Sequence, residues 1–112
     1  MSDGLNSWIG VDLDGTLARY DGWVGPDSIG EPVSLMADRL RAWVESGERV
    51  KIFTARVWSD PDGIAEEAIH KWLLKHFGFD LEVTCVKDYG MIELWDDRCV
   101  RVIENTGVRC CS

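Results

Sequence analysis

Short apolar runs alternate along the chain with longer segments in which apolar residues recur at helical spacing. Short apolar runs bounded by glycine, proline or charged residues are typical of buried strands. On this pattern we expect strands at residues 8–11, 50–53, 81–86, 91–95 and 99–103.

Two segments between these runs are expected to be helices. Over residues 33–46, apolar side chains repeat every three or four positions, and Gly47 marks the end of the helix. The second helix follows Asp60, whose carboxylate can cap it, with Pro61 in its first turn. Gly78 is expected to end this helix.

A loop rich in glycine and proline, residues 15–32, separates the first strand from the first helix. At its centre, Asp21 and Gly22 form a dipeptide that is typical of tight hairpin turns. We therefore expect a small hairpin flap after the first strand.

This order of elements is typical of an α/β fold. Strands that alternate with helices form a mainly parallel sheet, and we expect helices on both of its faces, in three layers. The length of 112 residues suits one compact domain spanning residues 1–112. In such sheets, ligands bind beyond the carboxyl ends of the strands.

The composition narrows the classes of partner. A formal net charge of −8 argues against a general nucleic-acid or membrane-surface binder, because such proteins rely on clustered Lys and Arg. The first residues lack the pattern of a signal peptide, and no apolar run approaches membrane-spanning length. We therefore expect no membrane association and a cytoplasmic location.

The cysteines give no sign of a metal site or of disulfides. Their spacing contains no C-x-x-C pair, which disfavours zinc and fits reduced thiols. We assign no function to the adjacent Cys110 and Cys111.

Polar and charged residues follow the four main predicted strands. Because the carboxyl ends of parallel strands meet at one edge of a sheet, we expect these side chains to gather there. They are Asp12 and Asp14, then Thr54 and Arg56 with Ala55 between them, then Lys87 and Asp88, and finally Asp96, Asp97 and Arg98.

This set of residues suits phosphoryl transfer. Converging carboxylates repel one another, and Mg²⁺ relieves that repulsion because it prefers oxygen ligands from carboxylates, water and phosphate. Asp12 can then attack phosphorus, and Asp14 can protonate the leaving oxygen and later deprotonate water. Thr54 can donate a hydrogen bond to the phosphoryl group, and Lys87 can supply positive charge to its oxygens.

Four motifs in this order resemble those of the haloacid dehalogenase superfamily of phosphohydrolases: "VDLDGTL", "IFTAR", the lysine of "CVKDYG", and "ELWDDR". The resemblance implies a Rossmann-like fold, a Mg²⁺ cofactor and an aspartyl-phosphate intermediate. It makes Asp12 the nucleophile and Asp14 the acid and base, with the Asp14 backbone carbonyl also on the metal. Asp97 is the preferred direct ligand and Asp96 a water-mediated one, although the sequence does not separate them.

The spacing leaves no room for the cap domain that larger members of this superfamily carry. Thr54 follows Asp12 by 42 residues and Lys87 follows Thr54 by 33, and each gap already holds a helix. We expect an open site that takes a phosphorylated small molecule or a nucleic-acid end, or one closed by a neighbouring subunit of a homo-oligomer.

A weaker similarity, carried by "TAR" and "DDR", links the chain to the phosphatase domain of phage polynucleotide kinases, which removes 3′ phosphates from nucleic-acid ends. Arg56 can bind a substrate phosphate or carboxylate, and Trp23 and Trp58 can stack a base.

Plainer interpretations remain open for several of these residues. Arg56 can instead pair with Asp60 or Asp62, Arg98 can pair with a neighbouring carboxylate, and the two tryptophans can be packing residues. For the whole chain, the alternative is a non-catalytic domain of the same fold that binds metal or a partner protein through its acidic edge.

Overall fold

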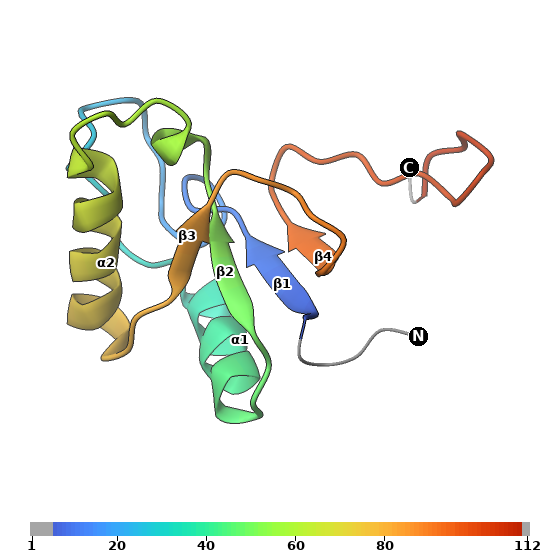
Figure 1. The fold of residues 1–112 in the computed structure, drawn as a ribbon, viewed down its shortest axis with the longest axis horizontal. Coiled ribbons are helices and arrows are strands. Elements are labelled where there is room, and N and C mark those ends of the chain that lie inside the picture. The colour runs from blue at the N-terminus through green and yellow to red at the C-terminus, as the bar shows by residue number, and fades with distance from the viewer. Residues whose placement is uncertain (1–5, 111–112) are drawn as a thin grey trace.

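The computed structural model of this chain describes residues 6–110. Four parallel strands form one sheet in the order β3-β2-β1-β4 (Figure 1). The α/β fold with a parallel sheet is therefore as predicted. The strands are β1 (Trp8–Val11), β2 (Val50–Phe53), β3 (Glu82–Thr84) and β4 (Met91–Trp95).

Two helices connect the first three strands. Helix α1 (Ser34–Glu45) follows β1, and α2 (Ile64–Phe77) follows β2 after a short 3₁₀ turn, η1 (Ala55–Val57). The bounds of α1 lie within one residue of the prediction, and Gly78 ends α2 with a left-handed φ of 80°.

The start of α2 differs from the prediction. Because the helix begins at Ile64, Pro61 precedes it and does not lie in its first turn. Asp60 caps the helix as expected, since its two carboxylate oxygens accept the backbone N–H groups of Ala65 and Glu66, each at 3.0 Å. The turn between Asp60 and Ile64 thus leads the chain into the helix.

Both helices pack on the same face of the sheet. On β1 and β2, alternate residues face one core, and the register pairs Ile9 with Val50 and Val11 with Ile52. That core also contains Met36 and Leu40 of α1 and Ile69, Trp72 and Leu73 of α2. The predicted arrangement with helices on both faces is therefore not formed by residues 6–110.

The reason lies in the order of the strands. The path β1-α1-β2-α2-β3 steps in one direction across the sheet, so crossovers of the same hand place both helices on one side. The return from β3 to β4 is only a short connection, residues 85–90, which has no helix.

This connection covers part of the other face. Asp88 accepts a hydrogen bond from Trp8 Nε1 at 2.8 Å, and the Trp8 N–H donates to the Gly90 carbonyl. Lys51 lies over the Trp8 ring, with Nζ 4.4 Å from the ring centroid. Trp8 is consequently buried although no helix lies above it.

The loop after β1 is closed at its base and has no hairpin. The Arg19 N–H donates to the Glu31 carbonyl, and Ala18 and Pro32 form an antiparallel bridge. No strand flanks Asp21 and Gly22 in the structure, so the predicted hairpin is wrong at this point. The loop is held by longer contacts, including one from Trp72 Nε1 to the Gly30 carbonyl at 2.9 Å.

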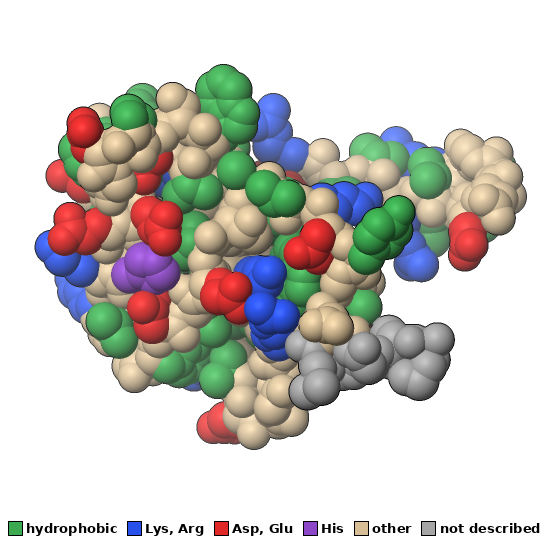
Figure 2. All heavy atoms as spheres, in the orientation of Figure 1, with side chains coloured by type: hydrophobic (Ala, Val, Ile, Leu, Met, Phe, Trp, Pro, Cys, Tyr) green, Lys and Arg blue, Asp and Glu red, His purple; other side chains and the backbone are tan. Residues whose placement is uncertain are grey.

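The predicted strand at residues 99–103 is also wrong. Residues 98–110, here called the arm, leave the edge of the sheet beyond β4 and extend away from the body (Figures 1 and 2). Within the arm, Val102 and Arg109 form an isolated antiparallel bridge. Apolar side chains alone cannot make a strand where no neighbouring strand offers hydrogen bonds, and Val100, Val102, Ile103 and Val108 are exposed.

In the described part of the chain, Cys85, Cys99 and Cys110 are free thiols, and Cys111 lies outside it. Neither α1 nor α2 combines the length and the apolar character that crossing a membrane requires.

Candidate functional site

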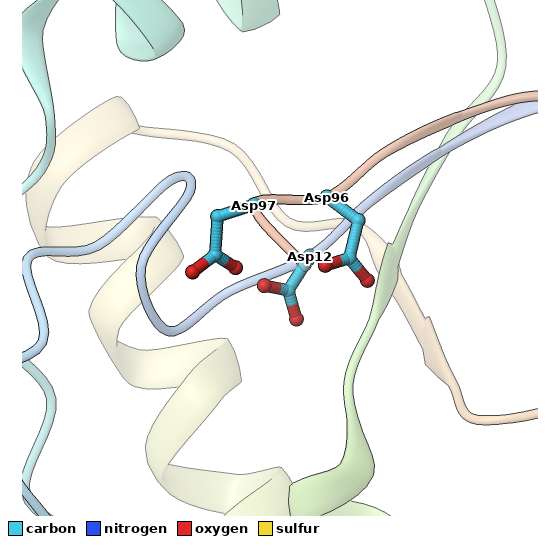
Figure 3. Close-up of side chains that lie close together, drawn as sticks. All are labelled: Asp12, Asp96 and Asp97. Carbon is cyan, nitrogen blue, oxygen red and sulfur yellow. The ribbon is translucent and has the colours of Figure 1, made fainter. Parts of the chain in front are cut away.

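Three aspartates meet at the carboxyl ends of β1 and β4. The register pairs Val11 with Trp95, and the Asp12 N–H donates to the Trp95 carbonyl at 2.9 Å. The residues that follow each strand are therefore adjacent. Figure 3 shows the carboxylates of Asp12, Asp96 and Asp97 turned toward one space, and one oxygen of each lies within 4.8 Å of the others.

Thr16 joins two of these aspartates. Its hydroxyl lies 3.2 Å from Asp12 Oδ2 and 3.3 Å from Asp97 Oδ1, and it accepts the Asp97 N–H at 3.0 Å. The side chain is only 8% exposed, so these bonds form away from bulk water. Thr16 thus fixes the spacing between the end of β1 and the residues after β4.

Gly15 makes room for Asp97. Its φ of 89° lies in the left-handed region, and a Cβ at this position would come within 2.6 Å of Asp97 Oδ2. Any side chain at residue 15 would therefore displace the Asp97 carboxylate.

The cluster strongly favours a positive charge. Partial burial of Asp12, followed by the negative charge of Asp96 and a hydrogen bond with Asp97, raises the pKa of Asp12 to about 7, although the Thr16 hydroxyl acts in the opposite direction. With this pKa, Asp12 is only partly ionised at neutral pH, and a cation bound at the cluster would favour its charged form. The all-oxygen donor set suits a hard divalent ion such as Mg²⁺.

Asp14 is not part of this cluster and pairs with Arg56. Arg56 Nε donates to Asp14 Oδ2 at 2.7 Å, and Nη2 donates to Oδ1 at 2.8 Å. The side chains of Asp14 and Arg56 are 21% and 6% exposed, so this bidentate pair is well shielded from solvent. The alternative pairing of Arg56 with Asp60 or Asp62 is not the one the structure shows.

Arg56 also holds the loop after β1. Its guanidinium donates to the carbonyls of Pro26 and Ser28, at 3.1 and 2.8 Å, and lies 5.0 Å from the ring centroid of Trp23. One side chain therefore fixes both Asp14 and the loop that carries Trp23.

Thr54 follows β2 directly and lies beside Arg56. Its hydroxyl accepts the Arg56 N–H at 3.1 Å and caps η1, which begins at Ala55. Thr54 is 2% exposed. Because a hydroxyl can accept and donate at once, Thr54 can still donate its own hydrogen to a bound ligand.

These residues line one open cavity of about 660 Å³. The structure brings together seven of the eight predicted site residues there: Asp12, Asp14, Thr54, Ala55, Arg56, Asp96 and Asp97. Arg98, Tyr20, Trp23 and Trp58 lie on the same cavity wall.

Lys87 is the exception among the described site residues. It lies on the connection from β3 to β4 and lines a neighbouring cavity of about 640 Å³ with Met91 and Leu94. Phe53 lines both cavities, so they are adjacent.

Sequence reasoning missed Thr16 as a site residue. It falls within "DGT", directly after the two aspartates of the first motif, and that position was the available signal.

Comparisons with protein-family models, curated proteins and solved structures yield no match to this chain.

Proposed function

We propose that this chain is a Mg²⁺-dependent phosphatase of the haloacid dehalogenase type, which hydrolyses a phosphomonoester through an aspartyl-phosphate intermediate. One observation carries the proposal: the carboxylates of Asp12, Asp96 and Asp97 converge at the carboxyl edge of a parallel sheet, on the cavity that Asp14 and Thr54 also line. Carboxylates arranged in this way suit a metal-assisted reaction of phosphate better than a structural role.

The donor set fits magnesium. Asp12 and Asp97 are proposed as direct ligands together with the backbone carbonyl of Asp14, and Asp96 as a ligand through water. When bound, Mg²⁺ would offset the negative charge between the carboxylates and the phosphate oxygens.

The side chains can divide the reaction between them. An Asp12 oxygen attacks phosphorus and forms the P–O bond, while the bond from phosphorus to the leaving oxygen breaks and Asp14 gives that oxygen a proton. Water then attacks the phosphorus, Asp14 takes its proton, and the bond to Asp12 breaks to release phosphate. Thr54 is proposed to hold a phosphoryl oxygen with its hydroxyl group, and the backbone of Ala55 to contribute beside it.

The ion pair between Asp14 and Arg56 affects the proposed role of Asp14 in proton transfer. Arg56 donates to both Asp14 oxygens, which aims the carboxylate but favours its charged form. A step in which Asp14 carries a proton therefore weakens one of these hydrogen bonds. Since Arg56 also binds the loop after β1, the proposal treats that loop as a flap whose position affects Asp14.

Two further cations can stabilise the phosphoryl group. Lys87 is proposed to reach it from the adjacent cavity, on the far side of Phe53, and Arg98 lines the site cavity itself. Arg98 is fixed next to the aspartates because its backbone N–H donates to Asp96 Oδ1 at 2.8 Å.

We also propose that the chain forms a single domain without a cap and acts in the cytoplasm.

The direct test is phosphate release from p-nitrophenyl phosphate and a panel of phosphomonoesters, with and without Mg²⁺. We expect Mg²⁺-dependent release that falls at least about 1,000-fold in Asp12→Asn, because the amide is a poor nucleophile of nearly the same size. Asp38→Asn, an exposed carboxylate on α1, is the matched control and should keep full activity. Substantial turnover by Asp12→Asn would overturn the assigned nucleophile.

The alternative is a non-catalytic domain that binds a metal ion or a partner protein through the same acidic cluster. Mg²⁺ binding that requires Asp97, without turnover of any phosphomonoester in the panel, would favour it.

A further inference from the structure

Two of the six tryptophans differ from the rest in their surroundings. Trp23 and Trp58 are 60% and 81% exposed, and both line the cavity that holds the aspartate cluster. The other four are buried or half-buried in packing contacts: Trp8, Trp43, Trp72 and Trp95. Large exposed aromatic side chains gathered at one cavity mark a binding surface more often than a packing role.

The Trp23 ring is held in place before any ligand arrives. The Arg56 guanidinium lies over it, and Arg56 is itself bound to Asp14 and to the Pro26 and Ser28 carbonyls. A ring fixed in this way loses little freedom when a ligand stacks on its exposed surface. Its position relative to Asp14 is also fixed, since the same arginine binds Asp14.

Trp58 lies close to Ala55 and Thr54, on the same cavity. It follows η1 directly, and its N–H donates to the Ala55 carbonyl at 3.0 Å, next to Thr54. Its backbone is thus anchored while its side chain remains exposed. Tyr20, 46% exposed, adds a third aromatic ring to the cavity wall.

We propose that these rings bind the base of a nucleotide whose phosphate lies at the aspartate cluster, with Trp58 and Trp23 as the stacking residues. The inference rests on the proposed phosphatase function and names its substrate class: a phosphomonoester of a nucleoside, free or at the end of an oligonucleotide. Stacking of a base on an aromatic side chain is worth about 5- to 150-fold in affinity. The net charge of −8 opposes long nucleic-acid contacts, so recognition centres on one nucleotide.

The test compares nucleoside 3′- and 5′-monophosphates and a short 3′-phosphorylated oligonucleotide with ribose 5-phosphate, which lacks a base. We expect Trp58→Ala to lower kcat/KM for the nucleotides at least about 5-fold more than for ribose 5-phosphate. Trp58→Phe keeps a ring and should recover most of this preference. Tyr89→Ala removes an exposed aromatic side chain outside the cavity and should leave the ratio unchanged.

The outcomes separate the two proposals. Equal losses on all substrates, with Mg²⁺-dependent turnover intact, would overturn the stacking site and leave the phosphatase standing. In the absence of turnover, calorimetric binding of adenosine monophosphate to Asp12→Asn, with and without Trp58→Ala, still tests the site. Binding that does not depend on Trp58 would refute it. The ranking of the 3′, 5′ and oligonucleotide substrates identifies the source of the nucleotide.

Discussion

At the scale of single residues, the positions of the acidic side chains depend on close contacts with two uncharged residues, Gly15 and Thr16. Gly15 lets the Asp97 carboxylate approach the backbone after β1, and Thr16 ties that carboxylate to Asp12. Neither residue can ligate through a carboxylate, yet both decide where the carboxylates lie. The positions of the three carboxylates are therefore set by neighbours in the first loop as much as by the strands.

Replacing Gly15 tests this dependence. Gly15→Ala should weaken Mg²⁺ binding at least about 10-fold, because losing even one well-placed ligand contact costs about 1.4 kcal/mol or more. Gly47→Ala is the matched control, since φ is 87° there against 89° at Gly15 but no atom would meet the added Cβ. Calorimetric titration with Mg²⁺ measures both variants. Equal affinity in the two would show that the Asp97 contact is unimportant.

The aspartates of the site could be predicted because each follows an apolar run. Parallel strands bring such positions together however far apart they are in the chain. The partner of Arg56 could not be predicted in this way. Asp60 and Asp62 are near it in sequence, but Asp14, 42 residues away, is the carboxylate that the fold presents to it. Lys87 lies in the adjacent cavity because the chain turns back across the sheet directly after β3.

At the scale of elements, polar contacts hold the start and the middle of helix α2. Asp60 caps its start, and His70, in the middle of the helix, lies 2.6 Å from Asp80, just before β3, and 3.2 Å from Glu66. Burial alone would lower the pKa of His70, but the hydrogen bonds that its ring donates to the Asp80 and Glu66 carboxylates outweigh burial, and the pKa is raised.

A pH dependence of stability follows from this shift. The His70 contribution should be fully present below pH 6.5, the ordinary histidine value, and should be lost as the pH rises through the raised value in the folded state. Because the site is well exposed to solvent, we expect His70→Gln to cost at most about 1 kcal/mol at pH 5.5 and less at pH 8.5. Urea unfolding at the two pH values measures this. An equal difference at both would contradict the ion pairing.

Helices and strands with a clear pattern of apolar residues were predicted well. Their arrangement around the sheet was predicted less well. The bounds of β1, β2 and β4 agree with the apolar runs, because strands of a parallel sheet are mostly apolar, although β2 contains Lys51 and β4 contains Glu93. The run at residues 99–103 looks the same in sequence, but beyond β4 it has no strand to pair with. Whether helices cover one face or two depends on strand order, which local periodicity does not encode.

At the scale of the whole molecule, negative charge is in excess and is concentrated at one sheet edge, so we expect the stability of the fold to depend on bound cations. The net charge is −8, and three carboxylates converge at one sheet edge, where their mutual repulsion opposes folding. A bound divalent ion should relieve that repulsion and stabilise the folded chain.

Thermal and urea unfolding measure this stabilisation. At a Mg²⁺ concentration about 100 times its dissociation constant, the free energy of unfolding should rise by about 2.7 kcal/mol. Asp97→Asn should abolish most of the gain, whereas KCl at equal ionic strength should not reproduce it in the wild-type protein. A gain that persists in Asp97→Asn would assign the effect to general screening of charge.

The pairing of β1 with β4 has a consequence for the order of folding. These strands lie at opposite ends of the described chain, and Thr16 and Asp97, which bond to each other, are 81 residues apart. Pairings of such long range are expected to form slowly, because closing the long intervening loop costs entropy before the contacts compensate for it. During synthesis, the carboxylate cluster stays incomplete until Asp97 has been added to the chain. The helical layer can thus assemble without the electrostatic conflict, which arises only when the last strand docks and a cation can resolve it.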